Sequence, residues 1–174
     1  MADYQIAELT EDHARQILDW RYPAPYDFYN PPIPARDAAD QALQDRYVEE
    51  FLNPDNGFHA VLDGDQQLAG FCSYGHDGQV PGGDYAAPAL DIGLGMRPEL
   101  TGQGRGRAFF EAIVAYGADH YRAARLRLTV ADFNHRAMAL YGRFGFRVGA
   151  RFQAHSSHTS YTILNLDLNL DVRL

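Results

Sequence analysis

Apolar and polar residues alternate in a short stretch near the middle of the chain, and this pattern predicts a β-strand. Leu90, Ile92, Leu94 and Met96 are apolar, and the positions between them hold aspartate or glycine, which is the period-two pattern of a strand. The strand ends before Pro98, because proline cannot extend a hydrogen-bonded ladder. Runs rich in β-forming residues predict further strands. These cover residues 4–9, 57–62, 68–74, 125–130, 146–152 and 160–168.

Apolar residues spaced three and four positions apart predict helices. The longest follows the central strand and covers residues 104–120, with Phe109, Ala112 and Ile113 on its apolar face. Another is capped by Thr10, whose side chain suits a helix start, and runs to about residue 20. Two more cover residues 37–51 and 134–145.

The order of these elements predicts an α/β (α+β) fold with a mixed, largely antiparallel central sheet flanked by helices. The turn Asp63-Gly64-Asp65 joins two strands as a hairpin, which requires antiparallel pairing. The helix at 104–120 instead joins two strands that can run parallel. A chain of 174 residues has room for one core, so we expect a single domain over residues 1–174.

Two stretches fit neither pattern. Residues 20–34 hold several prolines and aromatic residues, and we expect no regular structure there, because proline removes backbone donors. Residues 75–88 are polar and glycine-rich, which favours a mobile loop.

A glycine-rich turn links the central strand to the long helix. It reads Gly102-Gln103-Gly104-Arg105-Gly106-Arg107. The N–H groups of a first helical turn have no partner within the helix, and the helix dipole favours an anion there. Glycines let a ligand approach the backbone, and Arg97, Arg105 and Arg107 add positive charge. The turn therefore predicts a phosphate site, with a plain flexible loop as the alternative.

The spacing argues against two familiar phosphate motifs. A P-loop requires a lysine followed by serine or threonine, and the chain contains no lysine. The dinucleotide fingerprint needs glycines spaced as G-x-G-x-x-G, whereas Gly102, Gly104 and Gly106 recur at every second position.

Charge is unevenly distributed along the chain, whose net charge is −8. Residues 1–90 hold 4 arginines and 16 acidic residues, a net −12, and residues 91–174 hold 11 arginines and 7 acidic residues, a net +4. This distribution suits an anionic ligand at the second part and a cationic ligand at the first. An acidic surface kept for solubility is the alternative. The acidic balance and the lack of basic stripes argue against nucleic-acid binding.

Other features indicate a cytoplasmic protein without a metal site. No apolar run approaches the ~20 residues that span a bilayer, so we expect no membrane partner, and no signal peptide is visible. The single cysteine, Cys72, sits among apolar residues, so we expect a buried, inert thiol in a reducing compartment. The histidines are scattered, which argues against zinc. Nothing in the sequence indicates an oligomeric state.

The glycine turn resembles the acyl-CoA loop of the GNAT superfamily of N-acetyltransferases, whose pattern is Gln/Arg-x-x-Gly-x-Gly/Ala. Gly104 and Gly106 occupy the two glycine positions, and Thr101 stands in place of the Gln/Arg. A second segment matches the family at Asn134, Ala137, Tyr141, Gly145 and Phe146. The resemblance covers residues 58–153 and implies the GNAT fold.

The resemblance also implies acetyl-CoA as co-substrate and the residues that bind it. Tyr141 would act as the general acid that protonates the coenzyme A thiolate; a core tyrosine on an apolar stripe is the alternative. Asn134 would be a helix cap, a cofactor contact, or both. The implied cofactor-binding residues are Leu94, Gly95, Met96, Gly102, Gln103, Gly104, Arg105, Gly106, Arg107, Asn134 and Tyr141.

In this family the segment between the first two strands commonly forms part of the acceptor site. We therefore interpret residues 20–34 as a wall or lid of that site, with Tyr26, Phe28 and Tyr29 as substrate-binding residues. Packing of each aromatic ring on the core is the alternative.

Transfer to an amine also needs a neutral nitrogen, because an ammonium group has no lone pair for attack. A general base removes the proton and so produces the neutral amine. Some family members carry a glutamate on the strand before the asparagine, but this chain has Thr129 there, which cannot serve. Others carry one near the start of the central strand, a position that Asp91 approximates. Asp91 is therefore the candidate base, and a water chain using Glu8, Asp19 or a histidine is the alternative.

The resemblance, together with these features, predicts an N-acetyltransferase that moves an acetyl group from acetyl-CoA to a primary amine by direct attack in a ternary complex. The expected acceptor is a cationic small-molecule or peptide amine. Two alternatives stay open: a transferase that uses another acyl donor, such as propionyl or succinyl, and a non-catalytic acyl-CoA-binding sensor or interaction protein on the same fold. The presence of Tyr141 favours an enzyme.

Overall fold

A computed structural model describes residues 3–32, 41–155 and 157–168 of the chain. The α-helices are α1 (Glu11–Leu18), α2 (Gln41–Leu52), α3 (Gly106–His120) and α4 (His135–Arg143). The strands are β1 (Gln5–Glu8), β2 (Phe58–Leu62), β3 (Leu68–Tyr74), β4 (Leu90–Met96), β5 (Arg125–Ala131), β6 (Arg147–Gln153) and β7 (Ser160–Asp167). Short 3₁₀ helices include η1 (Tyr26–Tyr29), η4 (His76–Gly78) and η5 (Pro98–Leu100).

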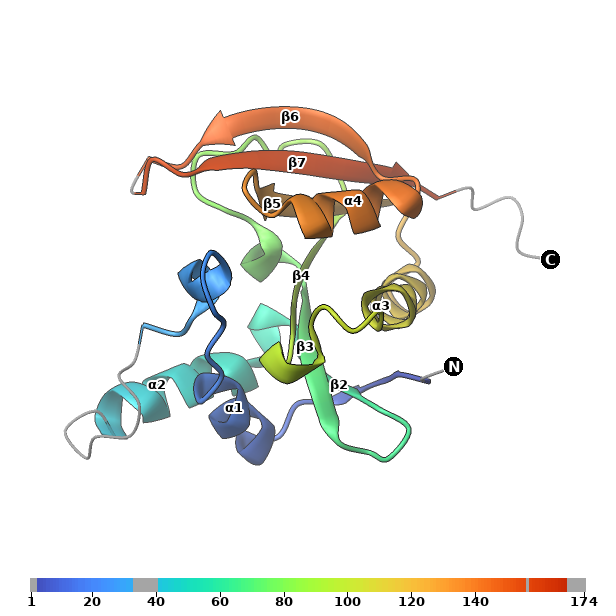
Figure 1. Ribbon diagram of the computed structural model, residues 1–174. Coiled ribbons are helices and arrows are strands. Elements are labelled where there is room, and N and C mark those ends of the chain that lie inside the picture. Colours follow the sequence, from blue (N-terminus) through green and yellow to red (C-terminus); the bar gives the residue numbers. More distant parts are fainter. Residues whose placement is uncertain (1–2, 33–40, 156, 169–174) are drawn as a thin grey trace. The chain divides into compact units, whose positions relative to one another are not determined.

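The strands form one mixed sheet in the order β1-β2-β3-β4-β5-β7-β6 (Figure 1). β4 and β5 run parallel, with Leu90 opposite Leu126 and Ile92 opposite Leu128. The pairs β1–β2, β5–β7 and β6–β7 are antiparallel. The expected mixed, largely antiparallel sheet is therefore confirmed. The parallel pair is also confirmed, and it consists of the strands that precede and follow α3 in the sequence.

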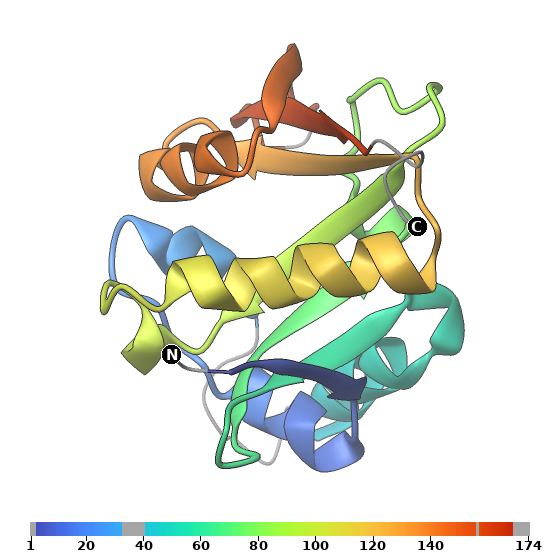
Figure 2. The ribbon, with the colours of Figure 1, turned by 90° about the vertical axis from the view of Figure 1, so that its right-hand side faces the viewer.

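Contacts divide the chain into two compact units. The first unit comprises residues 1–72 and 95–109, and the second comprises residues 73–94 and 110–174. Strands β3 and β4 and helix α3 each contribute residues to both units. Figure 2 shows α3 as one uninterrupted helix.

The core of the first unit forms under α1 and α2. Thr10 caps α1 by accepting a hydrogen bond from the His13 N–H, and the His13 side chain accepts one from the Thr10 N–H in return. This reciprocal capping satisfies two donors that a helix start leaves unpaired. The buried side chains that α1 and α2 supply to this core are Ala14, Ile17, Leu18 and Val48. The two helices lie side by side (Figure 1), and Arg15 of α1 donates to Asp45 of α2.

The core of the second unit is centred on Phe110 of α3, which is fully buried. Its ring packs against Tyr141 and Phe144, in and just after α4, and against Phe146 at the start of the following segment. Gly145 has φ of +90°, a left-handed conformation that suits glycine at the end of a helix. The chain therefore turns sharply after α4, as the pattern predicted.

The structure corrects the description of the two irregular stretches. Residues 20–32, here called the aromatic segment, contain the short helix η1. A 3₁₀ turn after Pro25 keeps backbone donors paired, as in the hydrogen bond from the Asn30 N–H to the Asp27 carbonyl. The glycine-rich loop contains η4 and is tied down by side-chain bonds described below. The expected start of α2 at Asp37 lies outside the described residues, and α3 begins at Gly106 rather than at residue 104.

Candidate active site

The glycine turn lies in the first unit and opens α3. Gly102 and Gly104 have φ of +75° and +76°, a left-handed backbone that only glycine adopts without strain. Gly104 is exposed, and a Cβ built on it would meet no atom within 4 Å. Helix geometry leaves the amides of this first turn without carbonyl partners, and left-handed residues help to turn such amides toward an anion. The turn therefore has the local geometry of an anion-binding site.

Side chains around this turn fix its shape and its charge. Gln103 donates to the Glu99 carbonyl at 2.6 Å, and the Thr101 hydroxyl donates to the Pro98 carbonyl at 2.8 Å. These bonds hold η5 against the turn that follows it. Arg105 and Arg107 are exposed, so both guanidinium groups are available to an anion at the helix start.

Tyr22 is a contact at the end of β4 that the sequence analysis did not single out. Its hydroxyl donates to the Met96 carbonyl at 2.8 Å. Burial, together with the nearby Glu99 carboxylate, raises the pKa of Tyr22 above its ordinary value. The aromatic segment is thus joined to the strand end that the resemblance assigns to the pantetheine arm.

The aromatic segment is closed by Asn30. The Asn30 side chain accepts from the Tyr22 N–H at 2.6 Å and donates to the Tyr22 carbonyl at 3.3 Å. Phe28 and Tyr29 are 45% and 40% exposed, and their rings meet edge to face at 5.3 Å. Two adjacent aromatic rings therefore face solvent on a braced segment, while Tyr26 is partly buried.

Helix α4, in the second unit, carries Tyr141. Asn134 caps this helix by accepting a hydrogen bond from the Ala137 N–H at 3.1 Å, so one of the two roles expected for Asn134 is present. Tyr141 is 7% exposed, and its ring lies 4.8 Å from that of Phe110. The ring is part of the core, which fixes the direction in which its hydroxyl points.

Asp91 is held in a buried ion pair with Arg127. The two residues are 3% and 4% exposed. Arg127 donates to both carboxylate oxygens, at 2.6 and 2.8 Å, and Gln79 donates to one of them at 2.8 Å. The bonded Asp91 carboxylate raises the pKa of Arg127. A carboxylate with three donors and almost no exposure is poorly placed to take a proton, and this geometry argues against Asp91 as the base.

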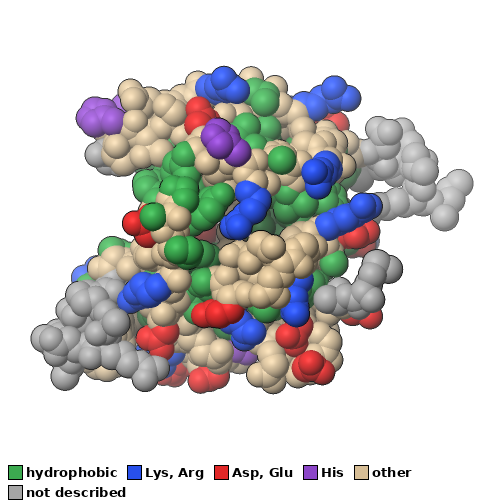
Figure 3. Space-filling model, in the orientation of Figure 1, with side chains coloured by type: hydrophobic (Ala, Val, Ile, Leu, Met, Phe, Trp, Pro, Cys, Tyr) green, Lys and Arg blue, Asp and Glu red, His purple; other side chains and the backbone are tan. Residues whose placement is uncertain are grey.

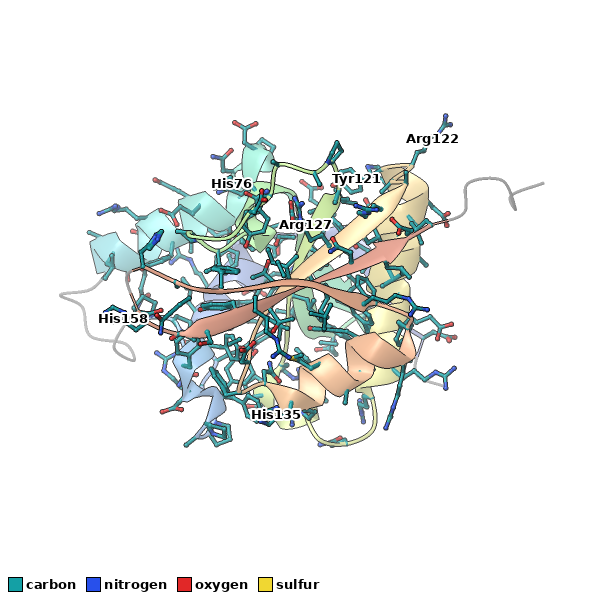
Figure 4. All side chains as sticks on the ribbon, turned by 90° about the horizontal axis from the view of Figure 1, so that it is seen from above. His76, Tyr121, Arg122, Arg127, His135 and His158 are labelled. Atoms are coloured by element: carbon teal, nitrogen blue, oxygen red, sulfur yellow. The ribbon has the colours of Figure 1, made fainter. Side chains whose placement is uncertain are left out.

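The Arg127 guanidinium also fastens the glycine-rich loop that follows β3. It donates to the Ala87 carbonyl at 2.8 Å and lies 4.9 Å from the centre of the Tyr85 ring. The Tyr85 hydroxyl lies 3.0 Å from that of Thr129. Figure 4 shows Arg127 and His76 in this region of the second unit. The loop expected to be mobile therefore has a buried cation as its anchor.

Two further observations concern metals and membranes. No group of three or more His, Cys, Asp or Glu side chains in the described ranges is arranged to hold a metal ion. Among the same residues, no helix is long and apolar enough to cross a bilayer. Cys72 is a buried thiol, as expected.

A family model for the acetyltransferase (GNAT) family matches residues 14–146, about three quarters of the chain. The chain belongs to the GNAT family. The expectation of an acyltransferase enzyme is thereby confirmed, and acetyl-CoA is the co-substrate of this family. No curated protein matches the chain in sequence.

Solved structures of GNAT proteins share the fold. A spermidine N-acetyltransferase SpeG chimera from Vibrio cholerae and hSSAT has a TM-score of 0.70 at 18% identity, covering 95% of each chain. A GNAT-family acetyltransferase from Bacillus anthracis has a TM-score of 0.69 at 14% identity, covering 96% of this chain and 98% of its own. The N-acetyltransferase PseH of Campylobacter jejuni, solved with acetyl coenzyme A, has a TM-score of 0.64 at 18% identity, covering 97% of this GNAT chain and 100% of its own.

Proposed function

We propose that this GNAT protein, acting as a single domain over residues 1–174, transfers an acetyl group from acetyl-CoA to a primary amine. The observation that carries the proposal is the exposed turn at the start of α3, with Gly102 and Gly104 in left-handed conformation and two exposed arginines beside them. Family membership supports the choice of acetyl-CoA. The buried thiol of Cys72 supports a reducing compartment, such as the cytoplasm.

The binding roles follow from the chemistry of each segment. Amides of residues 102–107 bind the pyrophosphate, and Arg105 and Arg107 add charge. Backbone groups of Leu94, Gly95 and Met96 pair with the pantetheine arm in the manner of an added strand. Bound acetyl-CoA supplies the acetyl thioester. Tyr22 orients the Met96 carbonyl through its 2.8 Å hydrogen bond, which supports a fixed geometry at this strand end.

Tyr141 is proposed as the general acid that returns a proton to the leaving thiolate. Its ring is packed against Phe110 and Phe146, so its hydroxyl is held in one direction. A hydroxyl held in place needs little reordering when the proton moves. Asn134 is proposed as a cofactor contact in addition to its role as the helix cap.

The proposed acceptor is a cationic small-molecule or peptide amine. Phe28 and Tyr29 are exposed and adjacent, and aromatic faces attract cations. Figure 3 shows acidic side chains (red) around α1 and α2 in the first unit, which supports attraction of a cation. Tyr26 is partly buried, and in this proposal it packs beneath the exposed rings that form the wall of the acceptor site.

A panel assay tests this function. The protein is incubated with acetyl-CoA and, separately, with spermidine, glycinamide, free amino acids, an aminoglycoside and a peptide with a free N-terminus. Free thiol and the mass of each amine are followed. We expect equal amounts of thiol and N-acetylated product with at least one amine. Tight acetyl-CoA binding without any acetylated amine would instead support the sensor alternative.

The alternative acyl donors are tested in the same assay. Propionyl-CoA and succinyl-CoA replace acetyl-CoA at equal concentration with the best acceptor. The proposal expects the highest kcat/KM with acetyl-CoA. A higher value with either other donor would keep the transferase assignment and change the donor.

A further inference from the structure

We propose that Asp77 is the base that takes a proton from the acceptor amine. The inference rests on the proposed function. It assigns the general base to a residue other than Asp91, which is buried in the ion pair with Arg127. Asp77 lies in η4, in the loop between β3 and β4, and its side chain is exposed. Asp77 and the residues that hold it in place all belong to the second unit.

The Asp77 carboxylate lies directly over β4. The hydroxyl of Ser73, a fully buried residue of β3, donates to Asp77 Oδ2 at 2.8 Å. A Cβ built on Gly93 would lie 3.3 Å from that same oxygen and 2.4 Å from the Ser73 hydroxyl. Gly93 immediately precedes Leu94, where the proposed pantetheine contact begins. The carboxylate is therefore set beside the segment at which the thioester would end.

Two glycines allow this close approach. A Cβ on Gly78 would lie 3.0 Å from the Ile92 backbone, closer than most real Cβ contacts, so the strand would have to shift slightly. A side chain at position 93 would fill the space that Ser73 and Asp77 occupy. Glycine at both positions lets η4 lie on the strand and bring its acidic residue to the strand's surface.

Hydrogen bonds hold η4 in this position at both ends. The Gly75 N–H donates to the Asp91 carbonyl at 2.9 Å, before η4. Gln79, directly after η4, donates from its side chain to the Asp91 carboxylate at 2.8 Å. Asp91 therefore positions the loop that carries Asp77, and Arg127 fixes Asp91 in turn. A base held in this way is preorganised for proton transfer.

The proton balance follows from the acceptor. A primary ammonium carries three protons on nitrogen. Asp77 takes one, which frees the lone pair for attack on the thioester carbonyl carbon, and because Asp77 is exposed it passes this proton to solvent. As the carbon–sulfur bond breaks, Tyr141 gives its proton to the leaving thiolate, and the nitrogen releases its second proton, which returns through solvent to restore the Tyr141 hydroxyl. The third stays on the amide product.

Asp77→Asn tests the proposal, because the amide oxygen can still accept from Ser73 while the group no longer takes a proton. At pH 7 an amine of pKa about 10.4 is neutral in roughly one molecule in 2,500, whereas an α-amine of pKa about 7.7 is neutral in roughly one in six. With spermidine, or the best alkylamine of the panel, we expect kcat/KM to fall by about 10² or more. With glycinamide, or the best α-amine, we expect a much smaller loss.

The pH profile with the alkylamine acceptor supplies a second readout. In Asp77→Asn, kcat/KM for an alkylamine should rise about tenfold per pH unit between pH 7 and 9, as the neutral fraction of the amine increases. Acetyl-CoA affinity, measured by calorimetry, and the melting temperature should match wild type. Asp84→Asn is the matched control, since Asp84 is an exposed aspartate of the same loop, and it should leave kcat/KM unchanged.

Four outcomes decide the matter. Loss in Asp77→Asn that is recovered at high pH supports the proposal. Activity within about twofold of wild type at pH 7, well below the range for a general base, overturns it, as does an equal loss in His76→Gln with none in Asp77→Asn. A wild-type protein that acetylates no amine at all counts against the proposed function itself.

Discussion

At the scale of single residues, Tyr141 combines a core position with a proposed chemical role. Its ring is buried against Phe110, and Tyr141→Phe keeps that ring, so the fold should survive. We expect kcat to fall by about 10²-fold, the low end for a general acid, because a thiol of pKa about 8.5 is a fair leaving group. Coenzyme A affinity should barely change. The measurement is kcat at saturating acceptor beside a coenzyme A titration of the same preparation.

A purely structural Tyr141 gives the opposite pattern. The melting temperature of Tyr141→Phe would drop slightly and kcat would stay within about twofold of wild type, which lies well below the general-acid range. That result would remove Tyr141 from the mechanism and leave the assignment of the glycine turn intact.

Gly104 tests the phosphate site. Gly104→Glu should abolish coenzyme A binding, because it places a carboxylate at the proposed anion site. Gly104→Ala carries the same left-handed backbone strain, roughly 1–2 kcal/mol, without the charge, and should bind more weakly than wild type but measurably. Gly64→Glu, where a Cβ also meets no neighbour within 4 Å, is the surface control. Calorimetry that gives wild-type affinity for a folded Gly104→Glu protein would contradict the site.

The sequence was sufficient to identify residues that belong to a local motif. It did not identify residues whose partners lie far away in the sequence. Gly104 and Asn134 were identifiable because local conformation demands them, and the structure gives them a positive φ and a helix cap. The bond from Tyr22 to Met96 joins positions 74 residues apart, and the pair of Asp91 with Arg127 joins positions 36 apart. No local pattern signals contacts of that kind.

At the scale of elements, the buried pair of Asp91 and Arg127 joins β4 to β5 and to the loop after β3. Removing one partner leaves the other charge buried without a counterion, so Arg127→Ala should lower the free energy of unfolding by about 3–5 kcal/mol. The double change Asp91→Leu with Arg127→Met should cost much less, because no buried charge then remains. Urea unfolding of the two variants gives the comparison.

The same pair distinguishes a structural Asp91 from a catalytic one. If Asp91 were the base, Asp91→Asn would lower kcat in a protein of normal stability. Our account expects a loss of stability in Asp91→Asn instead, together with weaker attachment of Gln79 and the loop. Equal stability with a fall in kcat of about 10² or more, the general-base range, would restore Asp91 as the base.

Tyr22 predicts a pH effect at the junction of the aromatic segment with β4. Burial raises the pKa of Tyr22 in the folded protein, so the folded state holds this proton more tightly than the unfolded state does. The stabilisation is fully present below the unfolded value of about 10 and is lost as pH rises above it. The stability of Tyr22→Phe should therefore fall less steeply than that of wild type as pH rises above about 10. Identical pH dependence in thermal melts of both proteins would refute this.

Element boundaries were predictable where pattern and caps agree. The strand Leu90–Met96 has the predicted bounds, because alternation and the proline that follows define both ends. The loop after β3 was not predictable, because its order depends on Arg127 and Asp91 rather than on its own residues. The helix η1 was missed because proline and aromatic residues also suit irregular chain.

At the scale of the whole molecule, the uneven charge predicts how the acceptor binds. Residues 1–90 carry a net −12. A cationic acceptor attracted by this charge should show a KM that rises with salt, since screening acts over about 10 Å at 0.1 M ionic strength. Initial rates with spermidine between 0.05 and roughly 0.3 M NaCl, which spans that screening range, give the measurement. A KM independent of salt, or a preference for anionic acceptors, would contradict it.

The order of the elements was enough to predict the mixed sheet and its parallel pair, because a helix between two strands permits parallel pairing and a short turn requires the antiparallel arrangement. The identity of the acceptor was not predictable from the sequence, because it depends on side chains brought together from distant segments. Of these segments, only the aromatic run near η1 forms a local pattern.

Transfer of a labelled acetyl group tests the central claim most directly. The protein, in excess over acetyl-CoA labelled in its acetyl group, is mixed with an active amine and quenched at successive times. The account predicts that label passes to the amine in a single phase, that none becomes attached to the protein, and that label stays in acetyl-CoA when the amine is omitted. Label that never leaves acetyl-CoA with any amine, or that first accumulates on the protein, would contradict direct acetyl transfer by this enzyme.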